Sequence, residues 1–203
     1  MEVMAGGVPI GYDEVGEGRT AVFLHGMPSS RAQMMHFYEP FFADRPGWRR
    51  VYPDLPGMGV TPGLDGEPTQ DRMLDTVAEF IDQVAGDEPI LLVGASYGGY
   101  LALGYSVRWG ERLAGLMLSE PMVRVRGKRQ VPEHTVLHED PELVAGLAED
   151  EAFWTQVAVI QSKKALDDFR IAIKPAFAAA DQEFLARLAP NAEYTSPSSA
   201  TPR

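Results

Sequence analysis

The sequence contains no cysteine and only four histidines among its 203 residues. Without cysteine, the chain has no disulfide, no thiol nucleophile and no cysteine-based zinc site. The last histidine is His138, so the C-terminal part of the chain offers no imidazole. We expect neither a metal ion nor an organic cofactor.

Positive charge is also scarce in this chain. Eighteen Lys and Arg stand against 29 Asp and Glu, which gives a formal net charge of −11. Since phosphate binding needs a basic surface, this balance argues against nucleic acid as a partner. The start, "MEVMAGGVPIGYDEVGEG", lacks the basic and then apolar regions of a signal peptide, so we expect a cytoplasmic protein.

One stretch without any charge, Pro89–Val107, is nearly as long as a membrane span. Its interior is interrupted by glycines and by Ser96, and its first half is short and rich in β-branched and other apolar residues. This pattern predicts a buried strand that turns into a buried helix, and no contact with a membrane.

Short apolar runs alternate with amphipathic segments along the first 120 residues. Hydrophobic residues make up 45% of the chain, enough for one domain with a sizeable core. Alternating strands and helices imply an α/β fold, with a parallel sheet covered on both faces. Strands are predicted within 8–18, over 21–26, from 48 onward, over 89–95 and over 113–120, and helices over 29–42, 69–87 and 97–109.

Strand patterns stop after Pro121. A basic, irregular stretch, "RVRGKRQ", leads into an alanine-rich region from about 141 to 188 that is predicted to be helical. We therefore divide the chain into a sheet domain at 1–122, a helical lobe at 123–190 and a tail at 191–203. The tail is rich in Ser, Thr and Pro, and we expect it to be disordered.

The pattern Gly94-x-Ser96-x-Gly98 stands between a predicted strand and a predicted helix, which is the context that this motif requires. Such a serine lies on a sharp, strained turn, so the residues two positions away must be small for strand and helix to approach. The turn exposes the hydroxyl, and the helix N-terminus favours developing negative charge. Ser96 is the predicted nucleophile; the alternative is a chance match in glycine-rich packing.

A second pattern, "FLHGMP", ends a predicted strand at a loop where an oxyanion hole needs a backbone N–H. The amides of Met27 and Tyr97 are the two predicted donors. His25 and Gly26 are predicted to shape this loop, and His25 is a weaker candidate for a general base.

These motifs, with "DLPGMGVT" between them, resemble the α/β-hydrolase fold family. "HGMP" matches its HG-x-P motif, "GASYGG" matches its nucleophile elbow, and "DLPGMGVT" matches its D-x-P-G-x-G-x-S loop with Thr61 in place of serine. The resemblance covers Val8 to about Pro121 and implies a three-layer sandwich with a mostly parallel sheet. It further implies that the helical lobe is a cap, as in esterases, proline iminopeptidases and C–C bond hydrolases, and that Asp54 fixes its loop.

A serine hydroxyl is a weak nucleophile unless a base takes its proton, and the base needs a carboxylate to orient it. The chain order in the family is Ser, then Asp or Glu, then His. Here no strand pattern follows Leu188 and no histidine follows His138. We therefore expect a shortened hydrolase core that lacks the C-terminal strands.

Three side chains remain as candidates for the missing roles. Glu120 ends a predicted strand, where some members of the family place their acid. His134 and His138 lie four residues apart, so a helix would place both on one face, where they could bind a metal ion as a pair. Alternatively, either histidine could act as the base if the start of the cap folded down over Ser96. His36 is predicted to lie at the surface.

The sequence thus predicts a serine hydrolase that cleaves an ester, amide or related bond of a small molecule through an acyl-enzyme on Ser96. The alternative is a catalytically silent remnant or ligand-binding module that keeps the pocket without the base. If strands are missing, the strand at 113–120, which carries no charge from Leu113 to Leu118, has an open edge, which predicts self-association.

Overall fold

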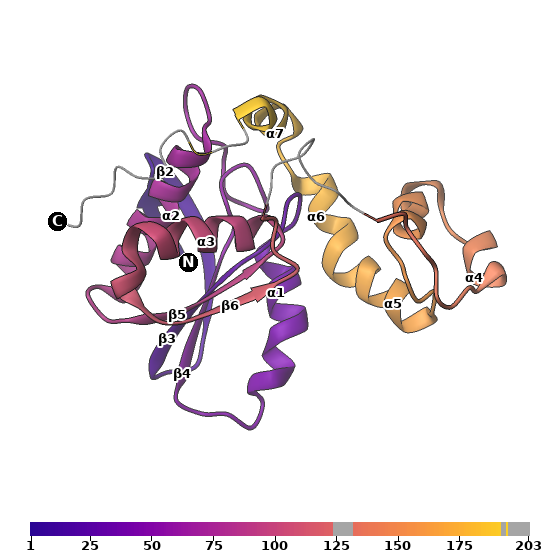
Figure 1. Ribbon diagram of the computed structural model, residues 1–203, viewed down its shortest axis with the longest axis horizontal. Helices are drawn as coiled ribbons and strands as arrows, with labels where there is room; N and C mark the ends of the chain where they lie inside the picture. The colour runs from indigo at the N-terminus through magenta and orange to yellow at the C-terminus, as the bar shows by residue number, and fades with distance from the viewer. Residues whose placement is uncertain (124–131, 192–193, 195–203) are drawn as a thin grey trace.

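A six-stranded sheet forms the centre of the N-terminal part of the chain (Figure 1). The computed structural model describes residues 1–123, 132–191 and 194. The strand order is β1-β2-β4-β3-β5-β6, and the last four of these strands run parallel. The strands are β1 (Glu2–Ala5), β2 (Val8–Val15), β3 (Arg19–Leu24), β4 (Trp48–Pro53), β5 (Ile90–Ala95) and β6 (Leu113–Ser119).

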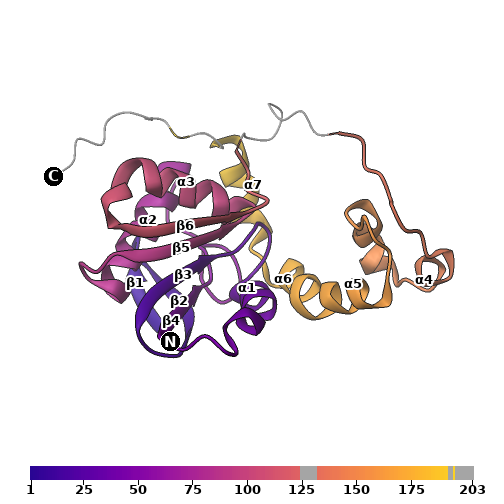
Figure 2. The ribbon, with the colours of Figure 1, turned by 60° about the horizontal axis from the view of Figure 1, so that its bottom comes forward.

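Helices cover both faces of this sheet, which confirms the predicted α/β fold. Figure 2 shows α1 (Arg31–Tyr38) on one face, and α2 (Gln70–Ala85) and α3 (Tyr97–Trp109) on the other. The amphipathic pattern of α2 buries Met73 and Phe80, and the Thr69 hydroxyl caps the helix by accepting from the Arg72 N–H at 3.2 Å. Two short 3₁₀ turns, η1 (Glu39–Phe42) and η2 (Gly110–Arg112), complete this part.

The predicted strand-to-helix segment at 89–107 is confirmed as β5 followed by α3. Strand β1 was not predicted, because four residues give too short a run for an alternating pattern to stand out. Among the helices that the structure describes, none is long and apolar enough to cross a membrane.

The region after residue 131 is helical, as predicted, and residues 132–191 contain no strand. A small apolar core of its own includes Trp154, Leu166 and Phe169. Its elements are α4 (Pro141–Ala145), η3 (Glu149–Gln156), α5 (Lys163–Asp168), the π-helix η4 (Phe169–Ile173), α6 (Lys174–Ala179), α7 (Gln182–Leu188) and η5 (Ala189–Asn191).

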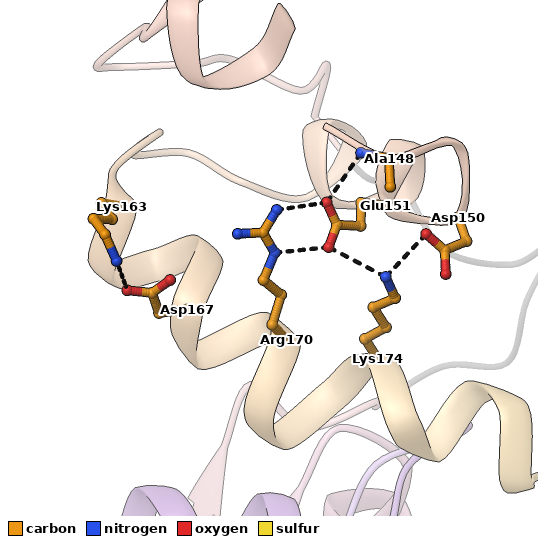
Figure 3. Close-up of polar contacts among 7 residues, drawn as sticks. All are labelled: Ala148, Asp150, Glu151, Lys163, Asp167, Arg170 and Lys174. Carbon is orange, nitrogen blue, oxygen red and sulfur yellow. Dashed lines mark hydrogen bonds and ion pairs between the residues drawn. The ribbon is translucent and has the colours of Figure 1, made fainter. Parts of the chain in front are cut away.

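A buried carboxylate joins η3 to the π-helix and α6 (Figure 3). Glu151 accepts two hydrogen bonds from Arg170, at 2.7 and 2.8 Å, one from the Ala148 N–H at 3.1 Å and one from Lys174 at 3.2 Å. The Arg170 guanidinium and the Ala148 N–H lower the pKa of Glu151 to about 2. These contacts hold the helical region in one arrangement.

Several contacts fasten the helical region to the sheet domain, among them a buried ring and a pair of polar side chains. The Phe184 ring of α7 is fully buried in the main core, against Gly57 and Gly63 of the loop after β4. On α1, His36 was predicted at the surface; its side chain is only 30% exposed, and its Nε2 lies 3.0 Å from Oδ1 of Asp168 on α5. This pair could not be foreseen because its members are 132 residues apart.

The basic stretch at 124–130 and nearly all of the tail predicted to be disordered, 191–203, lie outside the described residues. Tyr194 is an exception. Its ring stacks on Tyr100 of α3 with 4.7 Å between centroids, and its hydroxyl donates to the Tyr100 carbonyl at 3.2 Å.

Candidate active site

Ser96 occupies the turn between β5 and α3, with φ 49° and ψ −112°. A positive φ is rare in a non-glycine residue and costs on the order of 1–3 kcal/mol. The turn is tied to the end of β6, because the Ser96 N–H donates to the Ser119 carbonyl at 3.0 Å and the Ser96 carbonyl accepts from the Met122 N–H at 2.9 Å. Ser96 itself is exposed. The turn therefore presents this residue to solvent from a fixed backbone.

The glycines around Ser96 leave no room for a side chain. A Cβ at Gly94 would lie 2.5 Å from the Gly98 carbonyl oxygen, and a Cβ at Gly98 would lie 2.2 Å from the Leu24 carbonyl oxygen. Both neighbours are backbone atoms of the tightly packed β3, β5 and α3. This is the crowding that the sequence predicts for a sharp strand-to-helix turn.

The loop after β3 borders Ser96. A Cβ at Gly26 would lie 3.3 Å from Ser96 Cβ and 3.8 Å from its Oγ. His25 is fully buried, with its Nδ1 2.7 Å from the Gly26 carbonyl oxygen and its Nε2 2.9 Å from the Leu55 N–H. Burial lowers the pKa of His25. A neutral ring that donates through Nδ1 and accepts through Nε2 satisfies both contacts, so neither nitrogen remains for Ser96.

Asp54 fixes the loop after β4 from a buried position. Its carboxylate accepts from the Arg31 N–H at 2.7 Å, from Arg31 Nη1 at 2.6 Å and from the Val60 N–H at 3.0 Å. A Cβ at Gly59 would lie 2.2 Å from Asp54 Cγ. Thr61, which replaces the usual serine of the motif, accepts from the Gly11 N–H at 3.0 Å. These contacts match the loop-fixing role that the resemblance implies.

The two predicted oxyanion donors are the backbone N–H groups of Met27 and Tyr97, and each belongs to a segment beside Ser96. Met27 follows Gly26 in the loop beside Ser96, and Tyr97 is the first residue of α3, where amides have no partner within the helix. The Tyr97 hydroxyl is buried and donates to Oε1 of Gln70 at 2.8 Å, and burial raises the pKa of Tyr97. Sequence reasoning did not single out Gln70, because nothing marks a glutamine at the start of a helix as a buried partner.

No histidine reaches Ser96, although all four lie in the described part of the chain. His25 and His36 are engaged as given above, and His134 and His138 are exposed. The prediction that His134 and His138 share one face of a helix is wrong, because residues 132–140 form no helix. His138 instead makes an isolated β-bridge with Ile160. In Figure 2 this segment runs away from the sheet toward α4.

Glu120 directly follows β6 with φ 48°, and it is exposed. Its carboxylate forms no ion pair or hydrogen bond with residues 1–123, 132–191 or 194, so it orients no histidine there. Over the same residues, no group of three or more metal-ligating side chains occurs. The structure thus brings Ser96, Gly26 and Tyr97 together. It also places the backbone of Glu120 beside this turn, between Ser119 and Met122, and it leaves the candidate histidines without a contact to Ser96.

Two hollows lie near these elements, and Ser96 lines neither of them. One, of about 330 Å³, lies between α1, the loop after β4 and α6, with Arg31, Asp54 and Ala176 in its wall. The other, of about 190 Å³, lies on the outer side of α3 beside Tyr100 and Tyr194.

A parallel sheet covered on both faces, with a strained, exposed serine on the turn from a central strand into a helix, is the architecture of α/β hydrolases. The chain belongs to the alpha/beta hydrolase family, whose family model matches residues 21–202.

Individual relatives agree with this assignment. The chain is 33% identical over 118 residues to a 2-hydroxy-6-oxo-6-(2'-aminophenyl)hexa-2,4-dienoic acid hydrolase of Metapseudomonas resinovorans, covering 57% of this chain and 40% of that protein. It is also 33% identical over 118 residues to a proline iminopeptidase of Saccharolobus solfataricus, covering 56% and 37%. The chain therefore spans about two fifths of the length of these curated relatives.

A solved structure gives a more extensive match. The alpha/beta superfamily hydrolase from Oenococcus oeni superimposes with a TM-score of 0.83 at 27% identity. That match covers 96% of this chain and 72% of the other. The likeness therefore includes the helical region as well as the sheet.

Proposed function

We propose that this chain is a serine hydrolase that cleaves an ester, amide or related bond of a small molecule through an acyl-enzyme on Ser96. The observation that carries the proposal is the backbone of Ser96, held at φ 49° and exposed between β5 and α3. Strain of this kind persists only where the surrounding structure imposes it, and it concentrates at functional sites. Here the glycine contacts and the hydrogen bonds to the end of β6 impose it.

In this mechanism the Ser96 oxygen attacks the substrate carbonyl carbon while the hydroxyl proton passes to water, and the carbonyl oxygen becomes negatively charged. The scissile bond then breaks, the alcohol or amine leaves with a proton from water, and a second water molecule hydrolyses the ester on Ser96. The amides of Met27 and Tyr97 donate to the charged carbonyl oxygen, and the N-terminus of α3 adds a favourable field. One such donor contributes about 2.7–4 kcal/mol in well-studied serine enzymes. The buried hydrogen bond from Tyr97 to Gln70 holds the first residue of α3, and with it that amide, in place.

The helical region, residues 123–190, is proposed to act as a cap. In support of this role, α7 packs on the loop after β4 through Phe184, at the carboxyl ends of the parallel strands. Active sites of open α/β sheets lie at this end of the strands. The relatives named above are a dienoic acid hydrolase and an iminopeptidase, so the proposed substrate class stays broad.

The second candidate is a silent remnant or ligand-binding module. It is favoured by one observation: each of the four histidines lies in the described part of the chain, and none contacts Ser96. With an oxyanion hole but no working triad, hydrolysis exceeds the uncatalysed rate by only about 10³–10⁴-fold.

Turnover of an activated ester tests the proposal. Ser96→Ala is expected to remove hydrolysis, since alanine deletes only the nucleophile. Ser106→Ala is the matched control, because Ser106 lies on the same helix and its hydroxyl donates to the Leu103 carbonyl. Equal turnover of Ser96→Ala and the unchanged chain would refute Ser96 as the nucleophile. A pH profile governed by one group near neutrality would identify a histidine base, which His134→Ala and His138→Ala would assign.

A further inference from the structure

One helical run of the region after residue 131 lies against α1. It continues from α5 through the π-helix η4 into α6, and its residues Asp168, Ala172 and Ala176 are spaced four apart, so they share one face. Ala172 and Ala176 are only 2% and 3% exposed, although neither belongs to the apolar core of the helical region. The π-helix packs on α1, and Ala176 lines the hollow between α6 and α1. This face is therefore the one that meets the sheet domain.

A single polar contact crosses this interface. The Nε2 atom of His36 lies 3.0 Å from Oδ1 of Asp168, and it makes the only hydrogen bond or ion pair between the described residues 1–123 and 132–173. The far end of the helical region is attached more firmly, because α7 buries the Phe184 ring in the main core. The position of residues 132–173 therefore depends on the polar pair and on the small side chains beside it.

The run also contains a place where it can bend. The turns of the π-helix η4 interrupt the regular α-helical hydrogen bonds, and Pro175 in the first turn of α6 has no N–H to donate. Sharp bends in helices occur at elements of these two kinds. In Figure 2, the chain from α7 through α6 and α5 to α4 leads away from the sheet. Bending next to Pro175 therefore moves residues 132–173 away from α1 while α7 stays anchored.

The chemistry of the polar pair makes it sensitive to pH. Lys164 and His36 lower the pKa of Asp168 below its ordinary 3.8, so this carboxylate stays charged above about pH 4. Histidine is the side chain that ordinarily gains or loses its proton between about pH 5 and 8. A neutral imidazole can only donate a hydrogen bond to the carboxylate, whereas an imidazolium also attracts it as a full charge. The pair is thus stronger in mildly acidic solution and weakens as the pH rises past neutrality.

The other charged groups near this interface have partners of their own. Lys164 donates to the second oxygen of Asp168 at 2.6 Å, and a lysine keeps its charge over this pH range. The charged side chains of α1, of the elements packed on it and of the rest of the run are paired as follows: Arg31 with Asp13 and Asp54, Glu39 with Arg50, Arg49 with Glu14, Arg19 with the Trp48 ring, Asp167 with Lys163, Arg170 with Glu151, and Lys174 with Asp150 and Glu151. Asp168 is therefore the group that responds to the charge of His36.

We propose that His36 and Asp168 form a pH-sensitive latch, which holds residues 132–173 against α1 while His36 is protonated and loosens as His36 loses its proton. With the helical region as the proposed cap, loosening gives a substrate a wider path to Ser96, and only this consequence rests on the proposed function. The latch itself is measured without turnover.

A thiol placed in the interface measures its opening. Because the chain has no cysteine, Ala172→Cys introduces a single thiol on the face that meets α1. A buried thiol reacts with a dipyridyl disulfide only when the interface opens. Dividing its rate by the rate of the same chain in urea at the same pH removes the effect of pH on the thiol itself. This normalised rate is expected to be about two- to fivefold higher at pH 8 than at pH 5.5, the range that partly exposed ion pairs supply.

Further substitutions in the same background assign the effect to the latch. Asp168→Asn is expected to give the higher rate at both pH values, because no carboxylate remains to attract the imidazolium. Asp167→Asn is the matched control, since it removes the neighbouring carboxylate, which pairs with Lys163, and it is expected to keep the pH dependence. His36→Lys carries its charge at both pH values and is expected to abolish the pH dependence. Circular dichroism melting checks that each variant folds, and His36→Gln replaces Asp168→Asn should that variant unfold.

Three results would overturn the inference. One is a normalised rate that is equal at the two pH values, or lower at pH 8. The second is a pH dependence that survives in Asp168→Asn, which would assign it to the exposed His134 or His138. The third is a loss of the pH dependence in Asp167→Asn, which would make it a general effect of charge. None of these results bears on Ser96, whose own test is turnover.

Discussion

Replacing Phe184 by alanine is expected to destabilise the whole chain, because this ring joins the helical region to the sheet core. Phe184 is fully buried, and its ring atoms fill the space beside Gly57 and Gly63. Alanine leaves a cavity there, and Phe→Ala substitutions in cores cost about 3–5 kcal/mol. The cap of α7 remains intact, since Asp181 accepts from the backbone N–H of residue 184 at 2.9 Å. The decrease in the free energy of unfolding therefore measures the lost packing of the ring and not the loss of the helix cap.

Urea unfolding measures this cost. A domain of ordinary stability has about 5–15 kcal/mol in total, so the variant is expected to lose a large share of it. Melting temperature is expected to fall by about 2–4 °C for each kcal/mol. The matched control is Phe153→Ala, which removes a ring of the same region that is 43% exposed and contacts Phe177 with 5.3 Å between centroids. Its cost is expected to be clearly smaller than that of Phe184→Ala, because a ring this exposed leaves no enclosed cavity when it is removed.

Equal losses in the two phenylalanine variants would refute the reasoning, because they would mean that α7 does not pack on the core. A change in the slope of the unfolding transition for Phe184→Ala alone would indicate that the helical region detaches before the sheet unfolds. That result would still support the contact and would show that it joins two separable units.

Three further variants test the site and the helical region. Gly98→Ala forces a Cβ to within 2.2 Å of a β3 carbonyl oxygen and is expected to cost about 1–3 kcal/mol, whereas Gly110→Ala meets nothing within 4 Å and is expected to be tolerated; equal unfolding midpoints would contradict the crowding. Tyr97→Phe leaves the buried Gln70 amide without its donor and is expected to cost about 1–3 kcal/mol, which Tyr97→Phe combined with Gln70→Leu should partly restore. Glu151 has a pKa near 2, below its ordinary 4.5, so its stabilisation is complete above about pH 4.5 and is lost as the pH falls toward 2. Glu151→Gln is therefore expected to differ from the unchanged chain at pH 7 and to approach it near pH 2, and a pH-independent difference would contradict this.

Local patterns in the sequence were sufficient to predict every strand of the sheet except β1, the helices that cover the sheet, and the turn at Ser96. Strands β5 and β6 are short charge-free runs, α2 has one apolar face, and the glycines at 94 and 98 mark a backbone approach that no other residue permits. Each of these signals is contained within about twenty residues of chain.

Contacts between distant segments could not be predicted in this way. The pairs His36–Asp168 and Tyr97–Gln70 depend on how elements pack, and the residues themselves carry no distinguishing pattern. The same reason explains the error at His134 and His138. Their spacing of four residues suits a helix, but the pairing of His138 with Ile160 holds this segment extended.

The reactivity of Ser96 toward a fluorophosphonate probe tests the central claim most directly. The probe forms a covalent bond to a serine oxygen as fluoride leaves, and it does so rapidly only where the hydroxyl is activated and the developing charge is stabilised. We predict that mass spectrometry will find the label on the peptide containing Ser96, formed faster in the native chain than in urea and absent in Ser96→Ala. Labelling of Ser96 at the rate of an ordinary surface serine would contradict the hydrolase account and favour the silent, ligand-binding alternative.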